Sequence, residues 1–132
     1  MNKIPVLAAI AATVALSTSV SAHHSYAMFD HDREITLKGT VKEWQWTSPH
    51  TWLYMVVPNP KGGEPLKYSI EGGNPGLLRR QGFTKGSMAP GEKVTVYMSP
   101  LKSGQNGGAI NAVMLPNGKL LGERNKIIGA PS

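Results

Sequence analysis

The histidines are the side chains whose type and spacing point most directly to chemistry. The chain has four, and three of them, His23, His24 and His31, lie close together near its start. A cut before His23 would give that residue a free α-amino group, which chelates a metal ion together with its own imidazole. The amine ordinarily titrates at about pH 7.7–8, so a metal displaces its proton at modest cost. Because amine and imidazole nitrogens suit Cu(II), the pattern predicts a metal site with copper as its ion.

The remaining ligands of this predicted site come from the other histidines and from carboxylates. We expect His24 and His50 to complete it, ahead of His31, Asp30 and Glu71. Zinc and nickel accept the same nitrogens. One alternative is a mobile chain end whose histidines happen to follow the cut. For His50, the alternative is a packed, hydrogen-bonded side chain.

No other catalytic or cofactor-binding arrangement stands out. The chain has no cysteine, which excludes disulfides, thiolate metal sites, cysteine nucleophiles and c-type haem attachment. It has no G-x-S-x-G motif and no phosphate-binding glycine loop. The methionines lack a close M-x-x-M cluster, and most are expected in the core. No catalytic residue is therefore predicted, and a non-enzymatic role is favoured over a copper-dependent enzyme.

The first 22 residues have the three parts of a secretory signal peptide. Lys3 gives a positive start, Ile4 to Leu16 is an uncharged apolar run, and Val20-Ser21-Ala22 places small residues before a cut at His23. The apolar run is about 13 residues long, whereas a membrane-spanning helix needs roughly 20. An uncleaved anchor is the alternative. We therefore expect an exported protein, periplasmic or secreted, that does not span the membrane.

The chain that would remain after cleavage is basic and of single-domain size. Removing 22 of the 132 residues leaves 110, which suits one domain. The loss of Lys3 lowers the formal net charge from +6 to +5. Such a charge raises nucleic acid as a partner for a cytosolic protein, but export argues against it. A solvated basic surface is the plain interpretation, and attraction to an anionic envelope protein or lipid surface is the alternative.

Short alternating runs separated by Gly and Pro predict a series of strands. We expect strands at 34–46, 50–57, 66–71, 93–99 and 109–115, and a further short strand at 119–121. In the first strand the alternation slips between Val41 and Trp44, which indicates a β-bulge or bend. Asn74 and Pro75 are suited to begin a short helix after the third strand, and Gly82 is suited to end it.

This order predicts an all-β fold, a β-barrel of OB-like type, with one short helix between strands 3 and 4. A different small β-sandwich or roll is the alternative. The expected organisation is a signal peptide (1–22), an N-terminal arm (23–33), the OB-like barrel domain (34–122) and a loose C-terminal tail (123–132). Because the whole first strand separates the arm from His50, the sequence leaves open whether the arm reaches that residue.

Two tryptophans, Trp46 and Trp52, flank the His50 turn and are expected to line a face for a ligand or a partner. The alternative is that they are core or edge cover. The sequence thus predicts an exported copper-binding protein for metal handling, such as storage or delivery. The alternatives are a metal-free binding module that uses this aromatic face, and a copper-dependent enzyme.

The start of the mature chain and the turn at His50 resemble those of a family of small exported bacterial proteins of unknown function. Phe83 stands where we would expect Trp in that pattern. The resemblance implies that His23, His24 and His50 belong to the family's pattern, and it implies no activity. The matching positions are Ala22-His23-His24-Ser25, Phe29-Asp30, Leu37-Lys38-Gly39-Thr40-Val41, Trp46 with Pro49-His50 and Trp52, Glu71, Asn74, Leu77, Arg80, Gly82, Pro90-Gly91 and Pro116-Asn117-Gly118.

Overall fold

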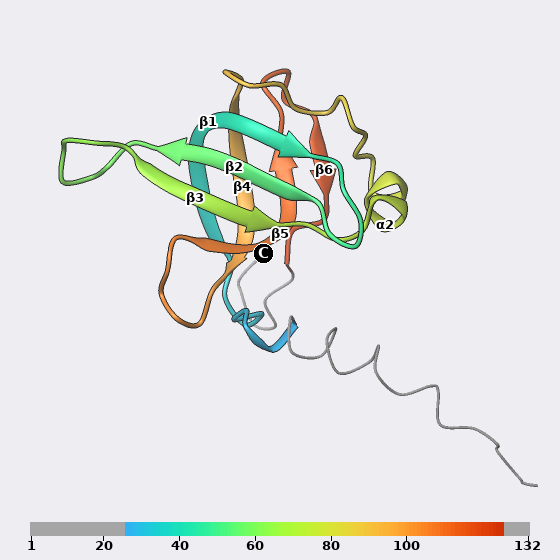
Figure 1. Ribbon diagram of the computed structural model, residues 1–132, viewed down its shortest axis with the longest axis horizontal. Helices are drawn as coiled ribbons and strands as arrows, with labels where there is room; N and C mark the ends of the chain where they lie inside the picture. The colour runs from blue at the N-terminus through green and yellow to red at the C-terminus, as the bar shows by residue number, and fades with distance from the viewer. Residues whose placement is uncertain (1–25, 126–132) are drawn as a thin grey trace, which may run out of the picture.

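The computed structural model describes residues 26–125, which form a single β-sheet and one short helix (Figure 1). The predicted signal peptide and the histidines at positions 23 and 24 lie outside the described residues. The elements are β1 (Ile35–Gln45), β2 (Trp52–Val57), β3 (Leu66–Glu71), α2 (Pro75–Arg80), β4 (Lys93–Pro100), β5 (Gly107–Met114) and β6 (Leu120–Gly122).

Five of the strands close into a barrel. The hydrogen-bonded order is β3-β2-β1-β4-β5-β6, and β3 also pairs with β5 in parallel, from Ser69↔Gly107 to Glu71↔Ala109. This parallel pairing joins the two ends of the sheet, while the short β6 adds to the free edge of β5. With α2 placed between β3 and β4, the architecture is the OB-like barrel that the sequence predicted.

The first strand bends because it contains a bulge. The pairing register of β1 with β2 shifts between Val41 and Glu43, where the sequence pattern slips. Gly39 allows the close approach of β2 at the same bend, since a Cβ atom there would lie 2.3 Å from the carbonyl oxygen of Val56. The bend lets one strand pair with β2 along one part and with β4 along the other, which is what barrel closure requires.

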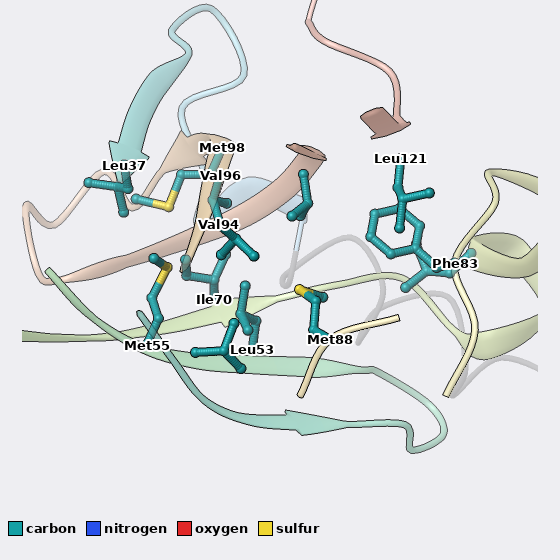
Figure 2. Close-up of a cluster of buried hydrophobic side chains, with 13 residues drawn as sticks. Leu37, Leu53, Met55, Ile70, Phe83, Met88, Val94, Val96, Met98 and Leu121 are labelled. Carbon is teal, nitrogen blue, oxygen red and sulfur yellow. The ribbon is translucent and has the colours of Figure 1, made fainter. Parts of the chain in front are cut away.

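The barrel interior is filled by one face of each strand (Figure 2). On β2, Leu53 and Met55 are buried, so Trp52 and Tyr54 point to the outer face of the barrel. The core members are Leu37, Val41, Leu53, Met55, Ile70, Leu78, Phe83, Met88, Val94, Val96, Met98, Val113 and Leu121.

The helix begins and ends at the predicted residues. The Asn74 side chain accepts a hydrogen bond from the Leu77 amide at 2.9 Å, and Gly82 has a positive φ of 94°. The Gly82 amide donates to the Arg79 carbonyl and the Phe83 amide donates to the Leu78 carbonyl, as in a Schellman motif. Leu78 is buried, whereas the neighbouring Leu77 is 40% exposed. Successive helical residues point about 100° apart, so Leu78 faces the barrel while Leu77 is turned partly toward solvent.

Both ends of the described chain are held against the barrel. Phe29 forms an isolated bridge with Leu101, and the Asp30 amide bonds to the Pro100 carbonyl at 2.8 Å. At the other end, Arg124 and Asn125 bond to Glu34. The segment from residue 123 was predicted to be loose, and its first described residues are thus tied down. No helix within residues 26–125 combines the length and apolar character that a membrane crossing requires.

Candidate functional site

Ligands of OB-folds generally bind on the outer face of strands 2 and 3, between the loop that joins strands 1 and 2 and the loop that joins strands 4 and 5. In this protein the corresponding loops are residues 46–51 and 101–106. The antiparallel register of β2 and β3 pairs Trp52 with Glu71 and Tyr54 with Ser69 on that face. The general binding region of the fold therefore contains aromatic, hydroxyl and carboxylate groups.

His50 and Glu71 contact each other at one end of this face. The Nδ1 atom of His50 lies 3.0 Å from Oε1 of Glu71. The carboxylate is mostly buried, at 13% exposure, and the imidazole is 41% exposed. When Nδ1 carries the proton that bonds to Glu71, the neutral ring has its lone pair on Nε2. The pair thus fixes which nitrogen of His50 is available to an incoming group.

The backbone on both sides of His50 is anchored. The Thr47 hydroxyl donates to the His50 carbonyl at 2.7 Å, and the peptide bond between Ser48 and Pro49 is cis. Thr51 is fully buried, and its amide and hydroxyl both bond to the Gly73 carbonyl, at 3.1 Å and 2.9 Å. The turn is therefore bound directly to the segment that follows Glu71.

The described part of the N-terminal arm lies at the same face, beside Glu71. Met28 and Phe29 line a pocket of about 270 Å³ together with Trp52, Glu71 and residues of the 101–106 loop. The Met28 carbonyl accepts a hydrogen bond from the Lys102 amide at 2.9 Å. In Figure 1 the first described residues, in blue, accordingly lie beside the orange loop that precedes β5. The arm thus passes next to the carboxylate that holds His50.

The two other described candidates for ligands are engaged elsewhere. The ring of His31 stacks on Tyr26 with a centroid separation of 3.9 Å, and its Nε2 lies 3.1 Å from the Tyr26 carbonyl oxygen. Asp30 accepts a hydrogen bond from the Asp32 amide and lies 4.0 Å from Arg33. Within residues 26–125 no three His, Asp or Glu side chains gather as a metal site would require. Among the predicted metal ligands within the described residues, His50 and Glu71 are the pair that come into contact.

The two tryptophans of the predicted aromatic face belong to different surroundings. The ring centroids of Trp46 and Trp44 lie 5.8 Å apart, and the Arg79 guanidinium lies 5.6 Å from the Trp46 centroid. Trp46 thus packs against the core beside α2. Trp52 instead stacks with Tyr54 at 6.4 Å on the outer face of β2. Of the two, it is Trp52 that lines the pocket beside Glu71.

A second polar cluster, which the sequence reasoning missed, surrounds Glu34. This carboxylate is 3% exposed and accepts hydrogen bonds from Arg124 Nε at 2.8 Å, from Asn111 Nδ2 at 3.1 Å and from the Asn125 amide. The Arg124 guanidinium also lies 4.2 Å from the centroid of Tyr97. This cluster has only a weak signal in the sequence, because Glu34 and Arg124 lie at opposite ends of the domain and no motif relates them. The contacts of Glu34 are those of a structural anchor.

Comparison with known proteins assigns the chain to a family but not to an activity. Residues 11–111 match the family described as "Family of unknown function (DUF6152)", and the chain belongs to that family. This agrees with the expected membership in a family without known function. No match is found among curated proteins.

Two solved structures are similar to part of this chain. One is a ZRD-deleted mutant of TiaS in complex with agmatine, with 19% identity and a TM-score of 0.45 over 63% of this chain. The other is the mitochondrial single-stranded DNA binding protein Rim1 of S. cerevisiae, with 12% identity and a TM-score of 0.47 over 69% of this chain. The aligned region spans 21% of the TiaS chain and 95% of the Rim1 chain.

Proposed function

We propose that the protein is exported, that it is cleaved before His23, and that it binds a copper ion for metal handling, such as storage or delivery. The ligands are the α-amino group and imidazole of His23, the imidazole of His24, and Nε2 of His50. The observation that carries the proposal is the 3.0 Å contact between His50 Nδ1 and Glu71 Oε1. Glu71 is a positioning residue in this proposal rather than a ligand.

The His50–Glu71 pair has the arrangement that commonly supports a metal-binding histidine. Such a histidine usually donates its second ring N–H to a carboxylate, which fixes the tautomer and the ring orientation and makes the ligating nitrogen more basic. Here the carboxylate is mostly buried while the imidazole is about two-fifths exposed. The difference in exposure supports a ring that is held from inside the protein and open to an ion from outside.

Covalent geometry allows the chain before Met28 to reach this pair. Met28 lines the same pocket as Glu71, and His24 precedes it by four positions. An extended chain spans at most about 3.6 Å per residue, so four residues span up to about 14 Å. The distance along β1, which made His50 seem remote from the arm, is therefore no obstacle.

The choice of copper follows from the donor set. An amine and imidazoles are good ligands for Cu(II). Among the divalent first-row metal ions, Cu(II) binds such sites most tightly. A copper-dependent enzyme would use the same ligands, and it is the other alternative for a copper-binding chain.

The test is native mass spectrometry of the exported protein with and without added Cu(II). The expected result is a chain that begins at His23 and retains one copper ion. His50→Gln should weaken Cu(II) binding, because the amide keeps much of the size of the ring but not its basic nitrogen. His31→Gln is the matched control, since that ring is stacked on Tyr26. A different N-terminus, or equal Cu(II) affinity in the wild type and in His50→Gln, contradicts the proposal.

A second candidate function is a metal-free module that binds a small ligand or an envelope protein through its aromatic face. The stacked pair of Trp52 and Tyr54 favours it, because both rings lie on the face where OB-folds bind ligands. This candidate would be favoured if the protein captures one partner equally well with and without copper and Trp52→Ala no longer captures it. Loss of capture when copper is chelated would instead favour the metal proposal.

A further inference from the structure

We infer that a pocket formed by β1, β4 and β5 binds a single-chain anionic amphiphile, a molecule with one negatively charged head and an apolar body. The pocket has a volume of about 550 Å³, within the range of about 300–1,000 Å³ that is usual for small-molecule sites. Its walls are residues of these three strands and of the turns that follow β2 and β5. Among the described residues it shares none with the pocket beside Glu71, so this site is independent of the proposed copper site.

The charged side chains that line this pocket are both positive: Lys38 on β1 and Lys93 on β4. Within residues 26–125 no Asp or Glu lines it, and neither lysine forms an ion pair. Glu92 precedes Lys93, but its carboxylate accepts a hydrogen bond from the Ala89 amide at 2.9 Å. A hollow that is lined by charges of one sign attracts the opposite charge, so the pocket favours an anion.

The strand register places both ammonium groups within reach of one anionic head. Lys38 lies opposite Thr95, and Lys93 lies two positions before Thr95 on the same strand, so the two lysines are diagonal neighbours. Both are on the outer face, since the adjacent residues Leu37 and Val94 are buried. Diagonal neighbours lie about 7–8 Å apart, which long side chains can bridge. One carboxylate or phosphate head can thus accept hydrogen bonds from both ammonium groups.

The apolar wall of the pocket continues the same row of residues onto the next strand. Thr95 of β4 pairs with Lys38 on one side and with Met114 of β5 on the other. Met114 and Leu115 are partly exposed, and Pro116 extends their apolar surface at the turn. A head that is held by the lysines would therefore place an attached hydrocarbon chain along Met114, where its removal from water is favourable.

Two lysines suit a single amphiphile better than a membrane surface. Anionic membranes are generally recognised by clusters of about four to eight Lys or Arg residues. The described lining contributes two, which matches the charge of one head group. The inference also gives a role to part of the formal net charge of +6, which the proposed copper site does not use.

The test is an NMR titration of the protein with octanoate, followed at the backbone amides without added copper. 1-Octanol is the neutral ligand of the same chain length, and hexanoate is the anion with a chain two methylenes shorter. The double variant Lys38→Gln/Lys93→Gln removes both charges of the pocket. Lys61→Gln/Lys67→Gln is the matched control, because it lowers the net charge equally at two exposed lysines outside this pocket.

We expect octanoate to shift the amides of β1, β4 and the end of β5. Loss of both pocket lysines should lower the octanoate affinity by about three- to tenfold, because two exposed ion pairs are lost, while the control stays within about twofold of the wild type. The affinity for 1-octanol should be the same in both double variants. Hexanoate should bind more weakly than octanoate, by about three- to fourfold for each methylene that the pocket buries.

Equal octanoate affinities in the two double variants overturn the inference, and so do octanoate shifts confined to other strands. Vesicles that contain an anionic phospholipid test the other occupant. A protein that binds these vesicles but not dissolved octanoate recognises a membrane surface, and the inference of a pocket for a single amphiphile is then wrong. Because no copper is added, each of these outcomes leaves the proposed function to its own test.

Discussion

The buried hydroxyl of Thr51 donates a hydrogen bond to the carbonyl of Gly73 at 2.9 Å. Thr51 directly follows His50, and Gly73 lies two positions after Glu71. The amide of Gly72 returns a bond to the Thr51 carbonyl at 2.8 Å. These bonds tie together the two segments that carry His50 and Glu71, so the contact between the two side chains is set by the backbone beneath them.

The close approach of these segments should not tolerate a side chain at position 72. A Cβ atom on Gly72 would lie 2.2 Å from the Thr51 hydroxyl oxygen and 3.3 Å from a methyl carbon of Leu78. We expect Gly72→Ala to lower the free energy of unfolding by about 1–3 kcal/mol, as overpacking does elsewhere. Urea denaturation measures it. Gly86→Ala is the control, because a Cβ atom there meets nothing within 4 Å. An equal unfolding midpoint for the two variants would show that the contact at position 72 relaxes freely.

The carboxylate of Glu71 should matter for copper affinity although it is not proposed as a ligand. Glu71→Gln keeps the shape of the side chain but replaces the charged acceptor of His50. Loss of such a supporting partner typically costs about 10–100-fold in metal affinity. Competition titration with Cu(II) measures the change. Glu64→Gln, in the exposed turn between β2 and β3, is the matched control. Unchanged Cu(II) affinity in Glu71→Gln would mean either that His50 is oriented without this carboxylate or that His50 does not bind the ion.

The core of β2 should contribute to stability without contributing directly to the site. Leu53 is fully buried behind the outer face that carries Trp52, and truncation of a buried leucine typically costs about 2–5 kcal/mol. We expect Leu53→Ala to lower the unfolding free energy by that amount. Below its unfolding transition, the variant should bind Cu(II) with nearly wild-type affinity. Leu120→Ala is the control, because Leu120 is already 41% exposed. Equal unfolding curves for the two variants would contradict this assignment of the core.

The fold was accessible from the sequence because its local signals agree with one another. The slip after Val41 marks the observed bulge, and Asn74 and Gly82 mark the ends of the helix. Local patterns do not reveal the parallel pairing of β3 with β5, because those strands are distant in the chain and their alternation is the same with or without it. Barrel closure was reached through the order of the elements, which matches a known architecture.

The site was predictable only in the part that one hairpin determines. Antiparallel pairing of 52–57 with 66–71 places Trp52 opposite Glu71, so His50 and that carboxylate had to lie at the same end. The course of the arm depends instead on the bridge between Phe29 and Leu101, and no sequence period encodes a contact of that kind.

The Glu34 anchor yields a prediction that is independent of metal binding. Its mostly buried carboxylate accepts hydrogen bonds from Arg124, Asn111 and Asn125, and a glutamine there would offer one oxygen and turn an amide N–H toward these donors. Hydrogen bonds to charged groups contribute about 1.5–3 kcal/mol each, and the half-exposed Arg124 contributes less because solvent screens it. We therefore expect Glu34→Gln to lower the unfolding free energy by about 1–3 kcal/mol.

Hydrogen exchange distinguishes this anchor from a general loss of stability. The Asn125 amide, which bonds to Glu34, should exchange faster in Glu34→Gln under conditions where core amides of β4 stay protected. Arg33→Gln is the control: Arg33 is 66% exposed and 4.0 Å from Asp30, so its loss should change the unfolding free energy by less than about 0.5 kcal/mol. Equal exchange at Asn125 in the wild type and in Glu34→Gln would mean that the segment after β6 is held by contacts other than this carboxylate.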